Sequence, residues 1–157
     1  MIFSFFKKKE QTETKIDAPR LKVYLHSHLI PGIDDGSQSM EESLILLQGM
    51  EALGYEKIIT TPHIMADAYR NTPEIINEGL SALREAAVKE GLSMEIEAAA
   101  EYYLDDGFED LLNKGEMMTL KGEYLLFETS YFAKPIQLED MIFAITSSGY
   151  KPVSYTH

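Results

Sequence analysis

The sequence contains no cysteine, and only four of its 157 residues are histidine. Without cysteine there can be no disulfide, no zinc–thiolate site and no thiolate nucleophile, so a hydrolase built from this chain needs another nucleophile. The same absence fits a reducing compartment, and we expect a cytoplasmic protein. Basic residues are also scarce, because 14 Lys and Arg stand against 26 Asp and Glu, a net charge of −12. That charge disfavours nucleic acid as a partner, although bound divalent cations can still attract a small anion to a cleft.

The sequence also lacks a long apolar run at its N-terminus. Residues 1–6 are mostly apolar and residues 7–9 are basic, the reverse of a secretory signal and far short of the ~20 apolar residues of a membrane span. We expect no transmembrane segment, and we expect residues 1–20 to form a tail and linker that allows a weak contact with an anionic membrane surface. Residues 21–157 are enough for one folded domain with a core.

Strand-like and helix-like segments alternate from residue 21 onward. Apolar and β-branched runs predict strands at residues 21–28, 57–61, 94–101, 124–127 and 151–157. Apolar residues at helical spacing predict helices between them, near residues 40–53, 73–87, 108–113 and 138–145. Ser39 and Glu42 form a capping box before the first of these helices, and Pro73 stands at the first position of the second. Such alternation is typical of βα units and predicts a parallel sheet or a barrel.

Side chains that can bind a metal ion stand at or just past the C-terminal end of every predicted strand. They are His26 and His28, His63, Glu101, Glu128 and His157. In a β/α barrel the catalytic residues gather at this end of the strands. His26 and His28 stand two residues apart, so on a strand both imidazoles point to the same face. The Pro-Gly turn that follows can return Asp34 and Asp35 toward the same point.

Imidazole and carboxylate ligands without thiolate suit zinc, manganese or iron. Glu101 and Glu128 could bridge two cations, and a cluster of two or three ions would turn a bound water into a hydroxide nucleophile and neutralise a phosphate. Other interpretations stay open: the paired histidines could lie incidentally on a surface strand, and Glu101 could belong to a solvated acidic stretch. Arg70, in the loop after His63, could hold a phosphate, although a lone loop arginine is commonly only solvated.

Four segments of the sequence resemble successive motifs of the polymerase-and-histidinol-phosphatase (PHP) superfamily. They are residues 26–36, 60–63, 99–104 and 126–128. Within this superfamily the sequence looks most like the bacterial metal-dependent protein-tyrosine phosphatases of capsular and exopolysaccharide gene clusters. The resemblance extends over about residues 21–157.

The resemblance implies an α/β fold, a distorted (β/α)7 TIM-like barrel of which about the first five strands are present. It also implies a site for up to three metal ions, usually Mn²⁺. Carried over residue by residue, the implied ligands are His26 and His28 for the first ion, Glu101 as its bridge to the second, Glu128 and His157 for the second, and Asp35 and His63 for the third. A metal-bound hydroxide would then hydrolyse phosphotyrosine on the bacterial tyrosine kinase that regulates polysaccharide chain length and export.

In the family, the strand that ends at His157 continues into a Pro-Glu-Arg-Tyr-like segment, and a later Ser-Asp-x-His-like motif adds two ligands. Neither segment is present in the sequence, so we expect a C-terminally truncated phosphatase domain whose activity the sequence leaves open. Two other functions stay in view. One is a PHP phosphoesterase that acts on a small phosphate ester such as histidinol phosphate, and the other is an inactive fragment that only binds metal or a partner. Nothing in the sequence indicates the oligomeric state.

Overall fold

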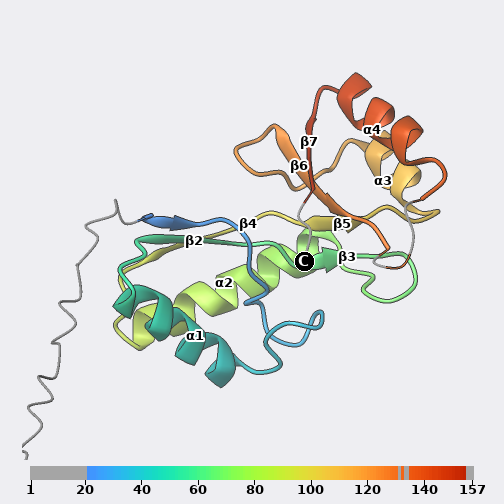
Figure 1. Cartoon of the computed structure of the whole chain (residues 1–157). Coiled ribbons are helices and arrows are strands. Elements are labelled where there is room, and N and C mark those ends of the chain that lie inside the picture. The colour runs from blue at the N-terminus through green and yellow to red at the C-terminus, as the bar shows by residue number, and fades with distance from the viewer. Residues whose placement is uncertain (1–20, 131, 133–134, 155–157) are drawn as a thin grey trace, which may run out of the picture.

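The computed structural model describes residues 21–130, 132 and 135–154 of the chain. Single strands or pairs of short strands alternate with helices along these residues (Figure 1). The order is β1 (Val23–Tyr24), α1 (Met40–Ala52), β2 (Lys57–Thr60), β3 (His63–Ile64), α2 (Pro73–Lys89), β4 (Glu95–Ala98), β5 (Glu101–Tyr103), α3 (Phe108–Lys114), β6 (Tyr124–Glu128), α4 (Leu138–Ser147) and β7 (Lys151–Ser154). All four predicted helices are present within the described residues. The predicted N-terminal tail, residues 1–20, and the last predicted metal ligand, His157, lie outside them.

Every pairing between these strands is parallel, in a three-stranded sheet of order β1-β2-β4 and a four-stranded sheet of order β3-β5-β6-β7. The chain passes from the first sheet to the second twice, because β3 begins three positions after β2 ends and β5 three positions after β4 ends. Backbone hydrogen bonds cross these interruptions, from Ala99 N to Thr60 O at 2.9 Å and from Glu101 N to Pro62 O at 3.0 Å. The predicted α/β class with parallel strands is thus confirmed.

The first predicted strand, residues 21–28, is much shorter than expected. Strand β1 comprises only Val23–Tyr24, and a threonine at the end of β2 binds the segment that follows it. Thr60 Oγ1 accepts a hydrogen bond from Leu29 N at 3.0 Å and donates one to Ser27 O at 2.9 Å. The Thr60 hydroxyl thus takes the place of a strand partner for these two backbone groups. The segment with the two histidines can therefore depart from the sheet after Tyr24 while Ser27 O and Leu29 N stay hydrogen-bonded.

Capping residues determine where the first two helices begin. At α1 the Ser39 side chain accepts a hydrogen bond from Glu42 N at 3.2 Å, whereas the Glu42 carboxylate accepts one from Gln38 N at 2.8 Å. In a standard capping box the glutamate accepts from the amide of the N-cap residue, here Ser39. Glu42 instead accepts from the amide of the preceding residue, Gln38. At α2 the Thr72 side chain accepts from Ile75 N at 3.4 Å, and a proline occupies the first turn. Local side chains thus specify both helix starts.

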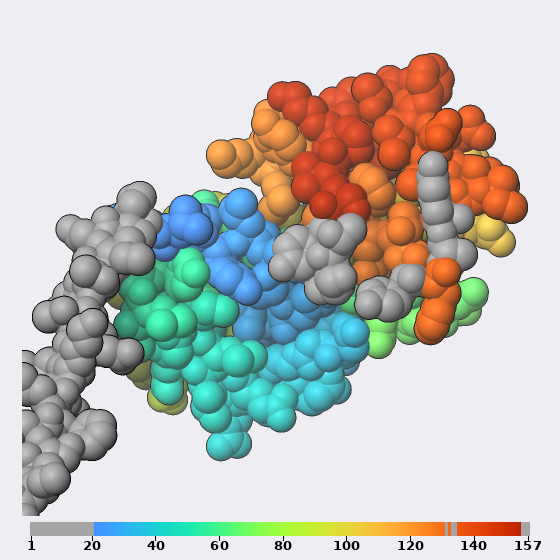
Figure 2. All heavy atoms as spheres, in the orientation of Figure 1, coloured from blue at the N-terminus to red at the C-terminus, as the bar shows by residue number. Residues whose placement is uncertain are grey.

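The helices divide between the two sheets. Helices α1 and α2 lie against β2 and β4, and α3 and α4 lie beside β6 and β7 (Figure 1). In the space-filling view of Figure 2, the N-terminal segments in blue and teal and the C-terminal segments in orange and red occupy opposite ends of the face. None of the helices in the described segments has the length and apolar character that a membrane crossing requires.

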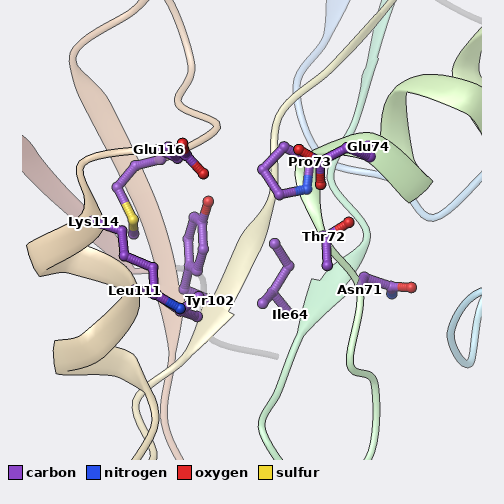
Figure 3. A pocket seen from close by; sticks show the side chains of 10 residues that line it. Ile64, Asn71, Thr72, Pro73, Glu74, Tyr102, Leu111, Lys114 and Glu116 are labelled. Carbon is purple, nitrogen blue, oxygen red and sulfur yellow. The ribbon is translucent and has the colours of Figure 1, made fainter.

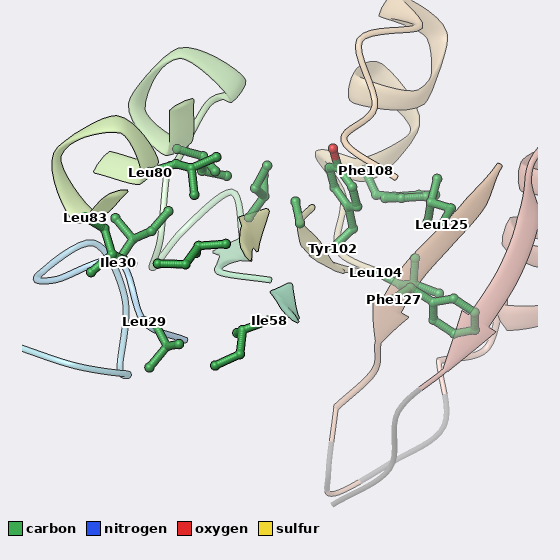
Figure 4. Close-up of a cluster of buried hydrophobic side chains, with 14 of the residues drawn as sticks. Leu29, Ile30, Ile58, Leu80, Leu83, Tyr102, Leu104, Phe108, Leu125 and Phe127 are labelled. Atoms are coloured by element: carbon green, nitrogen blue, oxygen red, sulfur yellow. The ribbon is translucent and has the colours of Figure 1, made fainter. Parts of the chain in front are cut away.

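One cluster of buried apolar side chains links the two sheets (Figure 4). It includes Leu29, Ile30, Ile58, Leu80 and Leu83 on the N-terminal side and Tyr102, Leu104, Phe108, Leu125 and Phe127 on the C-terminal side. Helix α2 buries the stripe that its periodicity predicts, at Ile76, Leu80, Leu83 and Ala87. Helix α1 buries only Ser43 and Leu47, and its C-cap residue Leu53 is 70% exposed. The core therefore depends on α2 more than on α1.

Candidate metal centre

Six of the seven predicted metal ligands lie together in the structure. Their potential ligand atoms form three groups, and within each group the atoms all lie within 4.8 Å of one another. The groups are His26, His28 and Glu101; His28, Asp35 and His63; and His63, Glu101 and Glu128. The seventh predicted ligand, His157, lies outside the described residues.

Strand register explains how the second half of this cluster forms. Strand β3 pairs with β5 so that His63 stands opposite Glu101, and β5 pairs with β6 so that Tyr103 stands opposite Glu128. Because residues two apart on a strand share a face, Glu128 points to the same side of the sheet as Glu101. His63 Nδ1 accordingly lies 3.6 Å from Glu128 Oε1.

Glu101 is at the centre of the cluster and is completely buried, with 0% of its surface exposed. Its Oε2 atom lies 3.4 Å from His28 Nε2, 3.4 Å from His63 Nδ1 and 3.8 Å from His26 Nε2. Neither oxygen of this carboxylate has a hydrogen-bond partner among the described residues. A buried carboxylate without hydrogen bonds is unfavourable unless positive charge lies beside it, and a divalent cation among the three imidazoles would supply that charge. The site therefore fits a divalent metal ion, and the interpretation of Glu101 as a solvated acid is wrong.

The first two histidines are each held through the Nδ1 atom, which directs Nε2 toward Glu101. His26 Nδ1 lies 2.7 Å from Thr61 Oγ1. His28 Nδ1 lies 2.7 Å from Asp34 Oδ2. Metal-binding histidines commonly have such a partner on the second ring nitrogen, because it orients the ring. Neither of these roles is evident from the sequence, in which Asp34 and Asp35 are neighbouring acids after one turn and Thr61 is one of two adjacent threonines.

The neighbouring acids Asp34 and Asp35 have different surroundings. Asp34 is only 6% exposed, and its carboxylate accepts hydrogen bonds from His28 Nδ1, Gly36 N and His63 N. The side chain of Asp35 is 61% exposed, and its Oδ1 lies 3.3 Å from His63 Nε2. Of the two acids, Asp35 therefore has the oxygen that a cation could reach, whereas Asp34 holds the histidines in place.

Opposing effects act on the pKa of His28. Burial favours the neutral ring, but the hydrogen bond to Asp34 and the nearby Glu101 carboxylate favour the charged ring more strongly and raise the pKa of His28 to about 9. Burial also opposes the charged form of Asp34, but hydrogen bonds from His28 and from two backbone amides outweigh it and lower the pKa of Asp34. The metal-free protein therefore holds an imidazolium–carboxylate pair at neutral pH. A cation that binds at His28 must displace a proton.

The loop after β3 orients His63. The ring of Tyr69 stacks on the His63 ring, with 5.6 Å between the centroids and 11° between the planes. Asn71 Nδ2 donates to His63 O at 2.8 Å and to Ile33 O at 2.9 Å, which ties this loop to the turn that carries Asp35. Neither Tyr69 nor Asn71 belongs to a motif that could be recognised in the sequence, so only the folded chain reveals these contacts.

Arg70, the predicted phosphate contact, lies in the same loop but lines a separate pocket. Its Nε donates to Ala66 O at 2.7 Å, and the pocket of about 250 Å³ has no residue of the metal-ligand cluster in its lining. An adjoining pocket of about 140 Å³ lies between the start of α2 and α3, with Pro73 on one side and Leu111 on the other (Figure 3). It too is lined by none of the cluster residues.

A larger hollow beside β1 does reach the cluster. It has a volume of about 550 Å³ and is lined by His26 and His28 together with apolar residues that include Tyr24, Leu29, Ile45 and Leu46. Ile45 and Leu46 of α1 are 60% and 47% exposed. The first two histidines are therefore accessible from a side whose walls are mainly apolar.

Imidazole and carboxylate groups that converge at the ends of parallel strands, around a buried glutamate, define an α/β protein with a candidate multi-metal centre. The sequence profile of a family described as capsular polysaccharide synthesis, CpsB/CapC, matches residues 22–156. The chain therefore belongs to the CpsB/CapC family. This confirms the family relationship that the sequence motifs indicate.

Individual relatives agree with the family match. The chain is 33% identical over 133 residues to the tyrosine-protein phosphatase CpsB of Streptococcus pneumoniae, and 26% identical over 132 residues to the tyrosine-protein phosphatase YwqE of Bacillus subtilis. Both alignments cover 83% of this chain but only 54% of CpsB and 52% of YwqE, so the chain spans about half the length of these curated relatives.

A solved structure shares the fold. It comes from a crystallographic description of YwqE and CpsB as metal-dependent tyrosine phosphatases, and it matches this chain with a TM-score of 0.77 and 26% identity. The match covers 84% of this chain and 54% of the solved one. The mixed α/β architecture with parallel sheets is thus common to both.

Proposed function

We propose that this chain is a metal-dependent protein-tyrosine phosphatase that acts in capsular polysaccharide synthesis. The observation that carries the proposal is Glu101, a fully buried carboxylate whose Oε2 lies within 3.8 Å of three imidazoles and whose oxygens have no hydrogen-bond partner among the described residues. The names of the relatives, tyrosine-protein phosphatases CpsB and YwqE, supply the reaction and the substrate class. The two lines of support are independent.

The proposed ions are Mn²⁺, and Zn²⁺ or iron would suit the same donor types. The proposed ligands are His26, His28, Asp35, His63, Glu101 and Glu128, with His157 outside the described residues as a seventh. Glu101 belongs to two of the three groups, and the two oxygens of its carboxylate suit a ligand that two ions share. When bound, such ions neutralise a phosphate and lower the pKa of an attacking water.

The chain's own residues would orient the ligands and exclude water. Thr61 and Asp34 hold the Nδ1 atoms of His26 and His28, and Tyr69 covers one face of the neighbouring imidazole of His63. Rings restrained in this way lose little conformational freedom when a ligand binds. A phosphate contact from Arg70 is also proposed, and it requires the guanidinium to leave its hydrogen bond to Ala66 O and turn toward the cluster.

We also propose the finer fold, a distorted (β/α)7 barrel in a phosphatase domain that begins at residue 21. Within each sheet the strand order follows the chain and all pairings are parallel, which supports this fold. Strand β1 at one edge of the first sheet and strand β7 at one edge of the second each have one hydrogen-bonded neighbour among the described strands. A further strand could therefore pair with each of them. Around β1, Leu21, Val23 and Leu25 are 78%, 40% and 51% exposed, as suits a surface that another element covers.

The test uses the full 157-residue chain, prepared free of metal and then loaded with Mn²⁺. We expect hydrolysis of a phosphotyrosine peptide that depends on Mn²⁺. Glu101→Gln should lower the rate by about 100-fold or more, because a neutral amide cannot balance the charge of the ions. Glu85→Gln is the matched control, since it makes the same chemical change at an exposed position of α2, and it should leave the rate unchanged.

Two results would contradict the proposal in different ways. Faster hydrolysis of histidinol phosphate than of the phosphotyrosine peptide would make a small phosphate ester the substrate. Metal binding without hydrolysis of either compound would make the chain a binding protein rather than an enzyme. The partner tyrosine kinase and the cytoplasmic location stay predictions of the sequence, and a phosphorylated kinase is the protein substrate to assay once peptide hydrolysis is established.

A further inference from the structure

Asp34 connects three parts of the candidate metal centre through one carboxylate. Its Oδ2 accepts hydrogen bonds from His28 Nδ1 at 2.7 Å and from His63 N at 3.0 Å. Its Oδ1 accepts a hydrogen bond from Gly36 N at 3.0 Å. Only 6% of the surface of Asp34 is exposed, so little water competes for these bonds.

The turn around Asp34 restrains the backbone on both sides of this carboxylate. A Cβ atom on Gly36 would lie 2.3 Å from His28 Cβ and 2.4 Å from His28 O, so only glycine permits the approach. Ser37 N donates to His28 O at 3.0 Å, and Gln38 Nε2 donates to Asp34 O at 3.0 Å. The carboxylate is therefore anchored before any ligand binds.

We propose that Asp34 is a positioning residue that aligns His28 and His63 for metal binding. An ionised carboxylate only accepts hydrogen bonds, so Asp34 keeps a proton on His28 Nδ1 and directs Nε2 toward Glu101 Oε2, 3.4 Å away. The same carboxylate oxygen holds the first backbone amide of β3, and so it sets where the strand with His63 begins. The Oδ2 atom of Asp34 thereby fixes the positions of two ligands, His28 and His63, relative to each other. This inference rests on the proposed metal centre but concerns affinity for the ion rather than turnover.

Two substitutions at Asp34 separate its contributions. In Asp34→Asn the remaining oxygen can still accept from His28 and His63, but the negative charge is lost and the amide NH₂ faces the Gly36 amide. Asp34→Ala loses all three hydrogen bonds. Because Asp34→Asn preserves the shape of the side chain, it keeps the test decisive even if the alanine variant does not fold.

Asp105 provides a matched control. Its carboxylate also accepts two backbone hydrogen bonds, from Ala66 N at 2.7 Å and from Gly107 N at 2.9 Å. It belongs to none of the three groups of potential metal ligands found among the described residues. Asp105→Asn therefore removes a carboxylate with a similar structural role away from the cluster.

The affinity for Mn²⁺ is measured by calorimetric titration of the metal-free full chain. Relative to the wild-type chain, we expect binding to be about 10-fold weaker in Asp34→Asn and about 100-fold weaker in Asp34→Ala. Asp105→Asn should change the affinity by less than about twofold. Amide hydrogen exchange adds a readout that needs no metal. The His63 and Gly36 amides should exchange faster in Asp34→Ala than in the wild-type chain, and at the wild-type rate in Asp105→Asn.

Mn²⁺ affinity in Asp34→Asn equal to that of the wild-type chain would overturn the inference, as would unchanged exchange at His63 and Gly36 in Asp34→Ala. Failure of the wild-type chain to bind Mn²⁺ is a different result. It would contradict the proposed function, and the exchange comparison would then decide the positioning role of Asp34 independently.

Discussion

At the scale of single residues, the protonation of His28 links the stability of the metal-free protein to pH. The pKa of His28 is raised from 6.5 to about 9, because the Asp34 hydrogen bond and the Glu101 charge outweigh the effect of burial. A group whose pKa is higher in the folded state stabilises that state while it is protonated. This contribution is therefore fully present below pH 6.5 and is lost as the pH rises through about 9.

We accordingly expect the metal-free chain to become less stable between pH 6.5 and about 9. The measurement is urea denaturation with a chelator present, repeated across this range. His28→Gln cannot titrate, so its free energy of unfolding should depend less steeply on pH over the same interval. Equal slopes for the two proteins would show that other groups cause the dependence.

At the scale of secondary-structure elements, close packing of α2 places the segment that carries the first histidines. Ile30 follows His28 by two residues and is 1% exposed against α2. A Cβ atom on Gly79 of α2 would lie only 2.2 Å from Ile30 Cγ2. Because isoleucine is branched at Cβ and rotates little, this side chain cannot easily move aside. The absence of a side chain at Gly79 therefore permits the contact.

Gly79→Ala should destabilise the protein by about 1–3 kcal/mol, because overpacking outweighs the roughly 1 kcal/mol that alanine gains in a helix. Gly49 of α1 is the matched control, since a Cβ atom there meets nothing within 4 Å. Gly49→Ala should stabilise the protein by up to about 1 kcal/mol. Urea denaturation of both variants measures the difference. Stabilisation by both substitutions would contradict the packing at Ile30.

At the scale of the whole molecule, the candidate metal centre joins parts that lie far apart in the sequence. His26 and His28 follow β1 in the first sheet, whereas Glu128 ends β6 in the second. Glu101, at the start of β5, lies in a group with each of these two sides. Ions bound here would therefore crosslink the two sheets and stabilise the folded chain by mass action.

We expect Mn²⁺ at about 100 times its dissociation constant to stabilise the chain by about 2.7 kcal/mol, which for a protein of this size raises Tm by about 5–10 °C. Thermal denaturation with and without a chelator measures the shift. Glu101→Gln should abolish it, and Glu85→Gln should retain it. Equal Tm values for the metal-free and Mn²⁺-loaded wild-type chain would contradict a site within the folded protein.

Patterns confined to neighbouring residues predicted most of the elements. The four helices appear where periodicity places them, and capping residues mark the starts of α1 and α2, because both signals act within a few turns. The predicted strand at residues 21–28 shrank to Val23–Tyr24, because Thr60 from another strand binds the backbone that follows. The interruption after β2 includes Pro62, which has no N–H to continue the ladder. The shortened first strand thus depends on a partner about 30 residues away, whereas the interruption after β2 coincides with a residue that can be read locally.

The sequence by itself determined the types of donor atoms, their order at successive strand ends and the family to which the chain belongs. Only the tertiary structure decided what each donor faces. It buries Glu101 among three imidazoles, assigns Asp34 to hold His28 and exposes Asp35 beside His63. The physical reason is that Asp34 and Asp35 are the same residue type in the same turn, so nothing in the local sequence distinguishes what their carboxylates bind. Burial and hydrogen-bond partners distinguish them only when separate strands converge.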